Sequence, residues 1–264
     1  MINIAKNKLM RYSYLQGRTW SSSEPAQGNV WPQGIRQHKE YYSADEATKE
    51  LFTVIDQIVF INLHSRKDRL ESISRFLSEC NIPTDKITRF SAVDREQQKP
   101  LTASILMNSN STLPGGALGC TWSHIGVLKL AKENGWKRIL VLEDDVEPIT
   151  TPKTFMIDLV EGLRETKKYD VLMLGWNSPM NDIGNTGKTT RGMALQTTSA
   201  YIVGEDFYDT LILDFTNSVA RQVQLDVHWF GLQTKSDFYA FTPRILKQAA
   251  GYSDIESKYV DYGV

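Results

Sequence analysis

The sequence predicts an α/β fold with a mixed, mostly parallel sheet flanked by helices, and three observations indicate this class. Short apolar runs of strand length alternate along the chain with longer segments of helical period. The runs at residues 58–61 and 139–142 are apolar at every position, which is typical of strands buried on both faces of a parallel sheet. Polar residues follow both runs, as expected at the carboxyl ends of strands, where such sheets bind ligands.

The individual elements follow from the same patterns. Strands are predicted where runs rich in large apolar and β-branched residues meet polar or turn residues, at 58–61, 87–90, 139–142, 170–174 and 197–203. Helices are predicted where apolar residues recur every three or four positions, at about 70–80, 123–134, 152–166 and 205–213. Segments 95–114 and 175–193 are polar or glycine-rich and predict surface loops.

Residues 1–50 are predicted to form an N-terminal extension, and residues 51–264 one globular domain. The first twenty residues carry four basic and no acidic side chains, and a Ser/Gly/Pro-rich stretch typical of a loop or arm follows them. Ser43 and Glu46 form a capping box that predicts a short helix towards Phe52. The basic start leaves two interpretations open, a solvated end or a weak contact with an anionic membrane surface.

Composition argues against several classes of protein. A formal net charge of −1 argues against nucleic acid as the main partner, because phosphate binding normally needs a basic surplus. No apolar run approaches the roughly 18 residues of a transmembrane span, and the first twenty residues lack the apolar region of a secretory signal. Cys80 and Cys120 are too few for a disulfide framework or a zinc site. These features predict a cytoplasmic protein with reduced thiols.

Three consecutive acids, Glu143, Asp144 and Asp145, follow the apolar run 139–142. Adjacent carboxylates repel one another and are costly near a core, so we expect a positive group beside them. Side chains at i and i+2 of an extended backbone point the same way, and two carboxylates so placed suit Mn²⁺ or Mg²⁺, which prefer oxygen ligands. The alternative is an acidic loop neutralised by a structural Lys or Arg.

Basic and histidine side chains supply candidates for anion binding. No glycine-rich phosphate loop is present, so the metal would neutralise phosphate with help from Arg66 or Arg69. Both arginines lie near a predicted helix start, where free N–H groups favour anions, although a solvated first turn explains them equally well. His124 follows a glycine-rich segment that precedes a predicted helix, and it either contacts a diphosphate or sugar or serves in capping and packing.

The segment 224–229 supplies a candidate base. Asp226 and His228 are two residues apart and able to share one face of an extended backbone, so either could be a general base or a third metal ligand. Trp229 either packs against a sugar or fills the core. The late segment around Gln248 and Ser253 either closes over the site or forms a simple C-terminal turn.

Together these motifs resemble glycosyltransferase family 25, the group of lipopolysaccharide-type and collagen-type sugar transferases. Their ordered succession spans about residues 57–256 and is more specific than any single motif. The chain departs from the pattern at Arg95, where glycine commonly follows the Ala-Val-Asp motif, and residues 1–50 match no motif. The matching motifs are Phe60-Ile-Asn-Leu63 with Arg66 and Arg69, Ala92-Val-Asp94, Gly119-Cys120 with Ser123-His124, Leu142-Glu-Asp-Asp-Val146, Thr198-Ser-Ala-Tyr201, Asp226, and Gln248 with Ser253-Asp254-Ile255.

The resemblance implies a GT-A fold, a UDP-galactose or UDP-glucose donor, and a divalent ion, Mn²⁺ or Mg²⁺. It implies inverting transfer of a hexose to a hydroxyl of a glycan, lipooligosaccharide or protein, in which a base takes the acceptor proton. Glu143 and Asp145 are assigned to metal and diphosphate with Asp144 in support, and Asp226 to the base or to sugar orientation. The residues assigned to nucleotide and donor are Asn62, Arg66, Arg69, Asp94 and His124. The lack of the secretory or retention signals of collagen-type members favours a bacterial-type or viral-type enzyme.

Two other functions stay open. A metal-dependent phosphohydrolase or nucleotidyltransferase would use the same acids, although no second cluster of Asp and His for a two-metal site is evident. A non-catalytic nucleotide-sugar binder would keep the fold without the chemistry, but the acids and Asp226 are retained. The acceptor, the donor sugar and the oligomeric state cannot be read from the sequence, because the loops that shape such pockets vary freely.

Overall fold

The computed structural model describes residues 43–94, 113, 115–177, 188–253 and 258–261. The chain divides into two units, Met1–His38 and Lys39–Val264, and every described residue belongs to the second. The predicted arm up to residue 42 therefore lies outside the described residues, as does most of the predicted loop 95–114. Within the described part of the chain, no helix combines the length and apolarity that crossing a membrane requires.

The described strands form a seven-stranded main sheet with the order β2-β1-β3-β7-β5-β8-β6. Pairing is parallel for β1 with β2 and β3, and for β5 with β8, whereas β7 and β6 are antiparallel to their neighbours. Five of these seven strands therefore run in one direction, which confirms the predicted mixed, mostly parallel Rossmann-like sheet. The strands are β1 Gln57–Asn62, β2 Ile87–Ser91, β3 Arg138–Glu143, β5 Val171–Met173, β6 Thr189–Arg191, β7 Ala200–Gly204 and β8 Phe238–Phe241.

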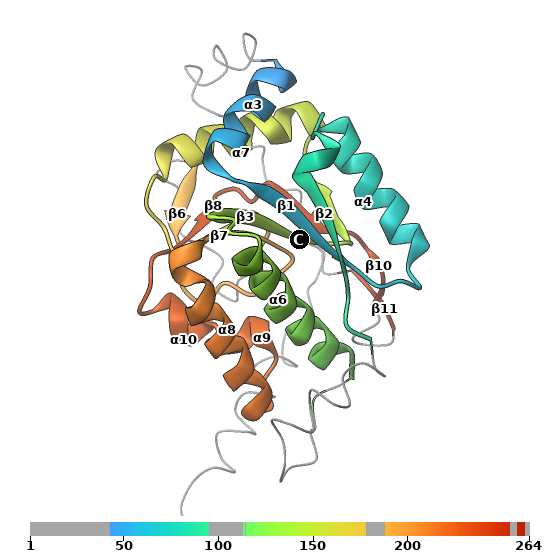
Figure 1. Cartoon of the computed structure of the whole chain (residues 1–264), viewed down its shortest axis with the longest axis vertical. Coiled ribbons are helices and arrows are strands. Elements are labelled where there is room, and N and C mark those ends of the chain that lie inside the picture. The colour runs from blue at the N-terminus through green and yellow to red at the C-terminus, as the bar shows by residue number, and fades with distance from the viewer. Residues whose placement is uncertain (1–42, 95–112, 114, 178–187, 254–257, 262–264) are drawn as a thin grey trace, which may run out of the picture. The chain divides into compact units, whose positions relative to one another are not determined.

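Helices cover both faces of this sheet (Figure 1). On one face lie α3 Ala44–Val54, α4 Lys67–Glu79 and α7 Pro152–Glu165, and on the other α6 Gly115–Glu133, α8 Glu205–Ala220, α9 Leu225–His228 and α10 Phe230–Gln233. The period of two along the strands divides the core between the faces. In β1, Ile58 and Phe60 join the first cluster, and Val59 and Ile61 the second. A one-residue slip would exchange the two sets, so burial on both faces fixes the register.

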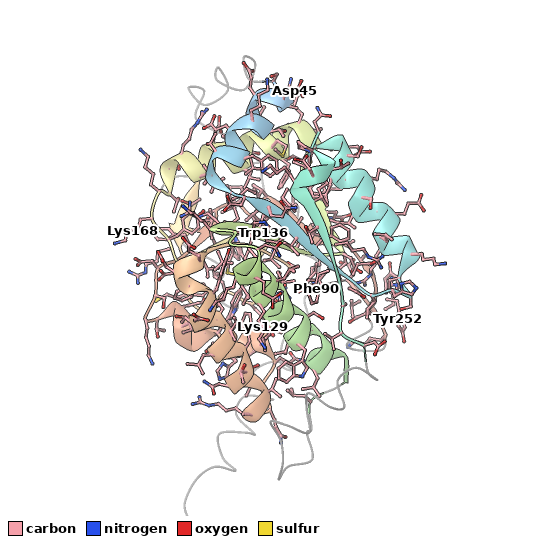
Figure 2. All side chains as sticks on the ribbon, viewed as in Figure 1. Asp45, Phe90, Lys129, Trp136, Lys168 and Tyr252 are labelled. Carbon is pink, nitrogen blue, oxygen red and sulfur yellow. The ribbon has the colours of Figure 1, made fainter. Side chains whose placement is uncertain are left out.

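Two elements differ from their predicted ranges because of tertiary packing. Helix α6 begins at Gly115 rather than near Ser123, so the glycine-rich segment is helical despite the low helix propensity of glycine. Further along this helix, Gly126 makes room for the Phe90 ring, which a Cβ there would meet and which lies against α6 in Figure 2. Helix α8 extends beyond the predicted residue 213 to Ala220, with Phe215 and Val219 buried in its added turns.

Four short strands form two separate two-stranded sheets near the carboxyl ends of β1 and β3. Strand β4, Val146–Pro148, pairs with β9, Leu246–Gln248, and β10, Gly251–Ser253, pairs with β11, Lys258–Val260. Strand β6 likewise lies within the segment 175–193 that the sequence predicts as a loop. Strands of three residues carry too little periodicity to be recognised in a sequence. The 3₁₀ turn Thr84–Lys86 links α4 to β2.

Candidate active site

A cavity of about 420 Å³ opens beyond the carboxyl ends of β1 and β3. The first turn of α6, the acidic triplet after β3 and the C-terminal strands form its walls. The sequence-predicted site residues that line it are Arg69, Asp94, His124, Glu143, Asp144 and Asp145. Asn62 and Arg66 do not line it, and Asp226 lines a neighbouring cavity. The structure therefore brings most of the predicted residues together where the sheet type places ligands.

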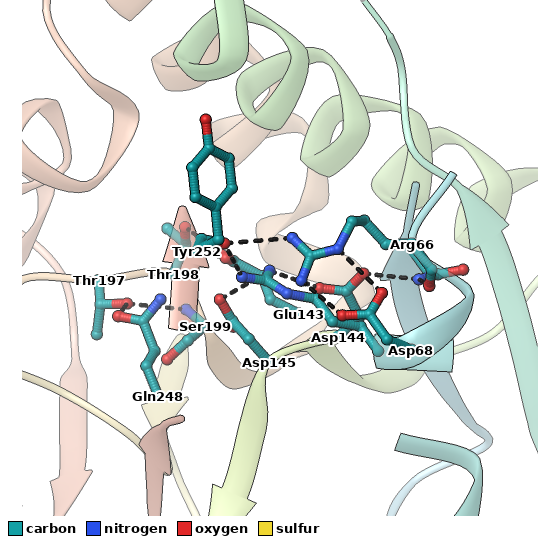
Figure 3. A network of polar contacts seen from close by, with 12 residues as sticks. Arg66, Asp68, Glu143, Asp144, Asp145, Thr197, Thr198, Ser199, Gln248 and Tyr252 are labelled. Carbon is teal, nitrogen blue, oxygen red and sulfur yellow. Dashed lines mark hydrogen bonds and ion pairs between the residues drawn. The ribbon is translucent and has the colours of Figure 1, made fainter. Parts of the chain in front are cut away.

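The acidic triplet has a positive partner within the chain. One nitrogen of the Arg69 guanidinium lies 3.0 Å from an Asp144 oxygen and 3.1 Å from an Asp145 oxygen. Figure 3 shows the three acids of the triplet within one network of polar contacts. All three side chains are largely buried, with 18%, 9% and 14% exposure. The structural arginine that the sequence leaves open as the alternative to a metal is thus present. It balances one of three carboxylates, so a formal surplus of two negative charges remains when all three are ionised.

The late segment closes over this cluster through its backbone. The Tyr252 carbonyl accepts hydrogen bonds from Arg66 at 3.2 Å and from Arg69 at 2.8 Å. Arg66 also forms an ion pair of 2.8 Å with Asp68, so its guanidinium is used in holding the first turn of α4 and strand β10. Gln248, Ala249, Tyr252 and Ser253 line the cavity. The segment therefore closes over the site, which decides between the two interpretations of the sequence.

Asn62 does not line the cavity but holds Asp144, the middle acid of the triplet, in place. Its side chain is 1% exposed, and its amide nitrogen donates to Asp144 at 2.7 Å and to the Arg66 carbonyl at 3.1 Å. Both Asp144 oxygens are thus occupied, one by Asn62 and one by Arg69. Asp144 therefore links β1 and α4 to the acidic turn.

Glu143 ends a chain of polar contacts on the α6 side of the sheet. Its Oε1 accepts from Thr198 at 3.0 Å and lies 3.3 Å from His124 Nε2, while His124 Nδ1 lies 3.1 Å from the Tyr201 hydroxyl. An ionised carboxylate only accepts, so Nε2 is the donor to Glu143 in this arrangement. Burial raises the pKa of Glu143, but the hydrogen bond and charge of His124 lower it further, and the net shift is downward.

The pKa of Asp145 is shifted in the opposite direction to that of Glu143. Burial, followed by the charge of Glu143, raises the pKa of Asp145 to about 7. Its Oδ1 is buried and has no hydrogen-bond partner among the described residues. A buried acceptor without a partner beside a surplus of negative charge is what a bound cation would satisfy. The oxygen donors and the charge of this cluster therefore fit Mn²⁺ or Mg²⁺.

Cys120 is a site residue that belongs to a matching motif but to which the sequence assigned no role. The ligand atoms of Cys120, His124 and Glu143 lie within 4.8 Å of one another. Burial and the nearby acids, Glu143 first, hold the pKa of the Cys120 thiol well above its usual range. The spacing of Cys120 and His124, four residues apart on one helix face, was the available signal, but the predicted helix began three residues too late to show it.

A second cavity of about 200 Å³ adjoins the first and shares Cys120, Glu143 and Gln248 with it. Asp226 lines this second cavity, and burial raises the pKa of its carboxyl. Thr198, Gln196 and Asn177 are further lining residues to which the sequence assigned no role. Glu143 thus stands between the acid-rich cavity and the cavity of the predicted base.

The neighbours of Asp226 correct two expectations. Residues 225–228 form helix α9 rather than extended backbone, so side chains two apart point in different directions. His228 Nδ1 lies 3.1 Å from Asp214 of α8 and does not line either cavity. Trp229 is fully buried, and its Nε1 donates to the Leu195 carbonyl at 3.1 Å. Trp229 is therefore a core residue, and of Asp226, His228 and Trp229 it is Asp226 that lines a cavity of the site.

Comparison with known proteins gives one family. Residues 55–178 match the model described as glycosyltransferase family 25 (LPS biosynthesis protein). A "Glycosyltransferase 25 family member" of Drosophila melanogaster is 26% identical over 149 residues, which cover 52% of this chain and 24% of that protein. "Procollagen galactosyltransferase 2" of Homo sapiens is 34% identical over 128 residues, covering 46% of this chain and 20% of that protein. The chain thus matches a quarter or less of the length of these relatives.

Solved structures similar to this chain have lower sequence identity to it than these relatives. A mannose-1-phosphate geranyltransferase from Thermus thermophilus is 11% identical, with a TM-score of 0.40 over 73% of each chain. A197 from STIV is 14% identical, with a TM-score of 0.36 over 73% of this chain and 94% of that one.

Proposed function

Because the chain belongs to glycosyltransferase family 25 through residues 55–178, we propose that it is a metal-dependent inverting hexosyltransferase. The observation that carries the proposal is the pair of adjoining cavities that meet at Glu143. One cavity offers acids and a guanidinium to a nucleotide sugar, and the other presents a buried carboxylate to an acceptor. Transfer between two substrates requires two such pockets with a common boundary.

The larger cavity suits the donor, UDP-galactose or UDP-glucose. Gly115 and Gly116, in the first turn of α6, line it, and backbone N–H groups at a helix start favour a diphosphate. Glycine lets phosphate oxygens approach the backbone closely. Asp94, at the exit of β2, lines the same cavity and is placed to accept a hydrogen bond from a ribose or base. Arg69 adds a positive charge on the opposite wall.

Glu143 and Asp145 would hold Mn²⁺ or Mg²⁺, with Asp144 fixed behind them by Asn62 and Arg69. When bound, such an ion neutralises charge on the diphosphate leaving group. Without it, three carboxylates beside one guanidinium would repel a diphosphate. The cluster thus explains why donor binding would depend on the metal.

Asp226 is our candidate for the base. In inverting transfer, the acceptor hydroxyl gives its proton to a carboxylate as its oxygen bonds the anomeric carbon and the bond to the diphosphate breaks. A buried carboxylate with a raised pKa is a better proton acceptor than an exposed one. The acceptor is a hydroxyl of a glycan, a lipooligosaccharide or a protein.

Titration calorimetry of the full chain with UDP-galactose and UDP-glucose, with and without Mn²⁺, tests this proposal. We expect binding of at least one donor that is strengthened by Mn²⁺ and lost in the double variant Glu143→Ala, Asp145→Ala. Absence of binding by any UDP compound in either condition would refute the donor. Binding that survives in the double variant with the same Mn²⁺ dependence would refute the metal ligands.

A further inference from the structure

A third cavity, of about 290 Å³, lies away from the candidate active site. Arg138, the first residue of β3, lines this third cavity, whereas Glu143, the last residue of the same strand, lies at the candidate active site. A six-residue strand separates its ends by roughly 16 Å, so the two cavities lie at opposite ends of the sheet. The cavity is bounded by α3, α7 and the segment after α7, and its lining residues are Glu50, Leu51, Val54, Arg138, Val160, Leu163, Arg164, Thr166, Lys167 and Tyr169.

Two buried polar groups meet in this cavity. Arg138 Nε and the Tyr169 hydroxyl are both buried and have no hydrogen-bond partner among the described residues. The Arg138 guanidinium lies 5.2 Å from the centre of the Tyr169 ring, and Tyr169 is 9% exposed. Native proteins seldom leave such groups unpaired, because a buried polar group without a partner costs about 1–3 kcal/mol. Two donors unsatisfied in one cavity indicate an acceptor that comes from outside the chain.

The charges point to an anionic acceptor. Three cations and one acid line the cavity, and the acid, Glu50, is paired with Arg164. No hydrogen bond or ion pair joins the side chain of Arg138 or Lys167 to any other described residue. Two positive charges therefore remain unbalanced in a chain whose formal net charge is −1. A planar guanidinium binds carboxylate or phosphate oxygens better than it binds neutral acceptors.

The remaining walls are apolar. Leu51 and Val54 from α3 face Val160 and Leu163 from α7 across the cavity. Helices α3 and α7 lie side by side in Figure 1, so a molecule between them would contact both. A bare inorganic anion would leave these walls unused.

We propose that this cavity binds an amphiphilic anion, a carboxylate or phosphate head on a short aliphatic chain. The head accepts hydrogen bonds from Arg138 Nε and the Tyr169 hydroxyl beside the Lys167 charge, and the chain packs between α3 and α7. The site is independent of the proposed glycosyl transfer, because none of its residues lines the two cavities that meet at Glu143. It would tie together two helices that pack on the face of the sheet opposite α6.

Titration calorimetry of the full chain with octanoate and with octyl phosphate tests the proposal. Octanol, which has the aliphatic chain without the charge, and inorganic phosphate, which has the charge without the chain, are the comparison ligands. We expect both amphiphiles to bind saturably and at least tenfold more tightly than octanol or phosphate. Arg138→Met should weaken octanoate at least tenfold, and Tyr169→Phe and Lys167→Met severalfold. Tyr169→Phe removes a buried hydroxyl that has no partner among the described residues, so this variant should fold as stably as the parent chain.

Lys168→Met is the matched control, because Lys168 is exposed like its neighbour Lys167 but does not line the cavity, and it lies at the outer surface in Figure 2. It should leave binding unchanged, as should Asp145→Asn at the distant site. Absence of saturable binding would refute the proposal. Equal binding of octanol and octanoate, or octanoate binding unaffected by both Tyr169→Phe and Arg138→Met, would refute the assigned anion contacts.

Discussion

Replacing Arg69 with methionine should destabilise the protein strongly and in a pH-dependent way. Arg69 makes hydrogen-bonded ion pairs with Asp144 and Asp145 and donates at 2.8 Å to the Tyr252 carbonyl. Methionine keeps most of the apolar stem and removes the charge. Removing one partner of a buried pair costs about 3–5 kcal/mol, and because Arg69 retains some exposure we expect about 3 kcal/mol near pH 8.

The direction of the pH dependence follows from the pKa shifts of Asp144 and Asp145. Burial raises the pKa of Asp144 and Asp145 in the folded state, and the Arg69 charge opposes this rise. Without Arg69 both folded pKa values rise further above their unfolded values. An acid whose pKa is higher in the folded than in the unfolded state stabilises the fold when it is protonated. This contribution to the free energy of unfolding is complete below the unfolded pKa and is lost as the pH rises through the folded pKa. The variant should therefore lose less stability near pH 5.5 than near pH 8.

Urea unfolding of the parent and variant chains at these two pH values measures the effect. Arg75→Met is the control, because Arg75 lies on the same helix, is 62% exposed and pairs with exposed Glu71. Its cost should stay within about 0.5 kcal/mol at both pH values. A destabilisation by Arg69→Met no larger than that of the control, or one that is greater near pH 5.5, would refute the assigned role of Arg69.

Three further predictions concern the chemistry of the site. The double variant Glu143→Ala, Asp145→Ala should lose metal-dependent donor turnover while retaining a folded circular-dichroism spectrum, and turnover equal to that of the parent would contradict its metal-binding role. Asp226→Asn should bind donor normally but transfer about 10²–10⁴-fold more slowly, and a steady-state assay showing near-normal transfer would remove Asp226 as the base. Cys120→Ser should weaken binding of Cd²⁺ in calorimetry while leaving Mg²⁺ unchanged, since thiolates prefer soft ions. Cys80→Ser, at a buried thiol outside the site, is the control, and an equal effect of both substitutions would exclude Cys120 as a soft-metal ligand.

The parts of the fold that sequence predicts well are those with strong local signals. The runs 58–61 and 139–142 are apolar throughout and became the central strands β1 and β3. The capping box of Ser43 and Glu46 is present, with the Ser43 amide donating to Glu46 at 2.8 Å. The position of the acids just after β3 then follows, because the end of a buried strand is also its exit to the ligand-binding edge.

The parts that sequence could not supply depend on contacts across the chain. The start of α6 was missed because the glycines in its first turns lower the helix propensity of that segment. The position of Asn62 behind the site could not be predicted, because its partner Asp144 lies 82 residues away. The helical turn at Asp226 has only four residues, too few to show a helical period.

The most direct test of the central claim is identification of the nucleotide released when the full chain is incubated with UDP-galactose or UDP-glucose, Mn²⁺ and a hydroxyl acceptor. We expect UDP, in an amount that depends on the metal and falls in the double variant Glu143→Ala, Asp145→Ala. Release of UMP with a hexose phosphate would instead indicate attack at phosphorus, as in a phosphohydrolase. That result would contradict assignment of the two cavities at Glu143 to donor and acceptor.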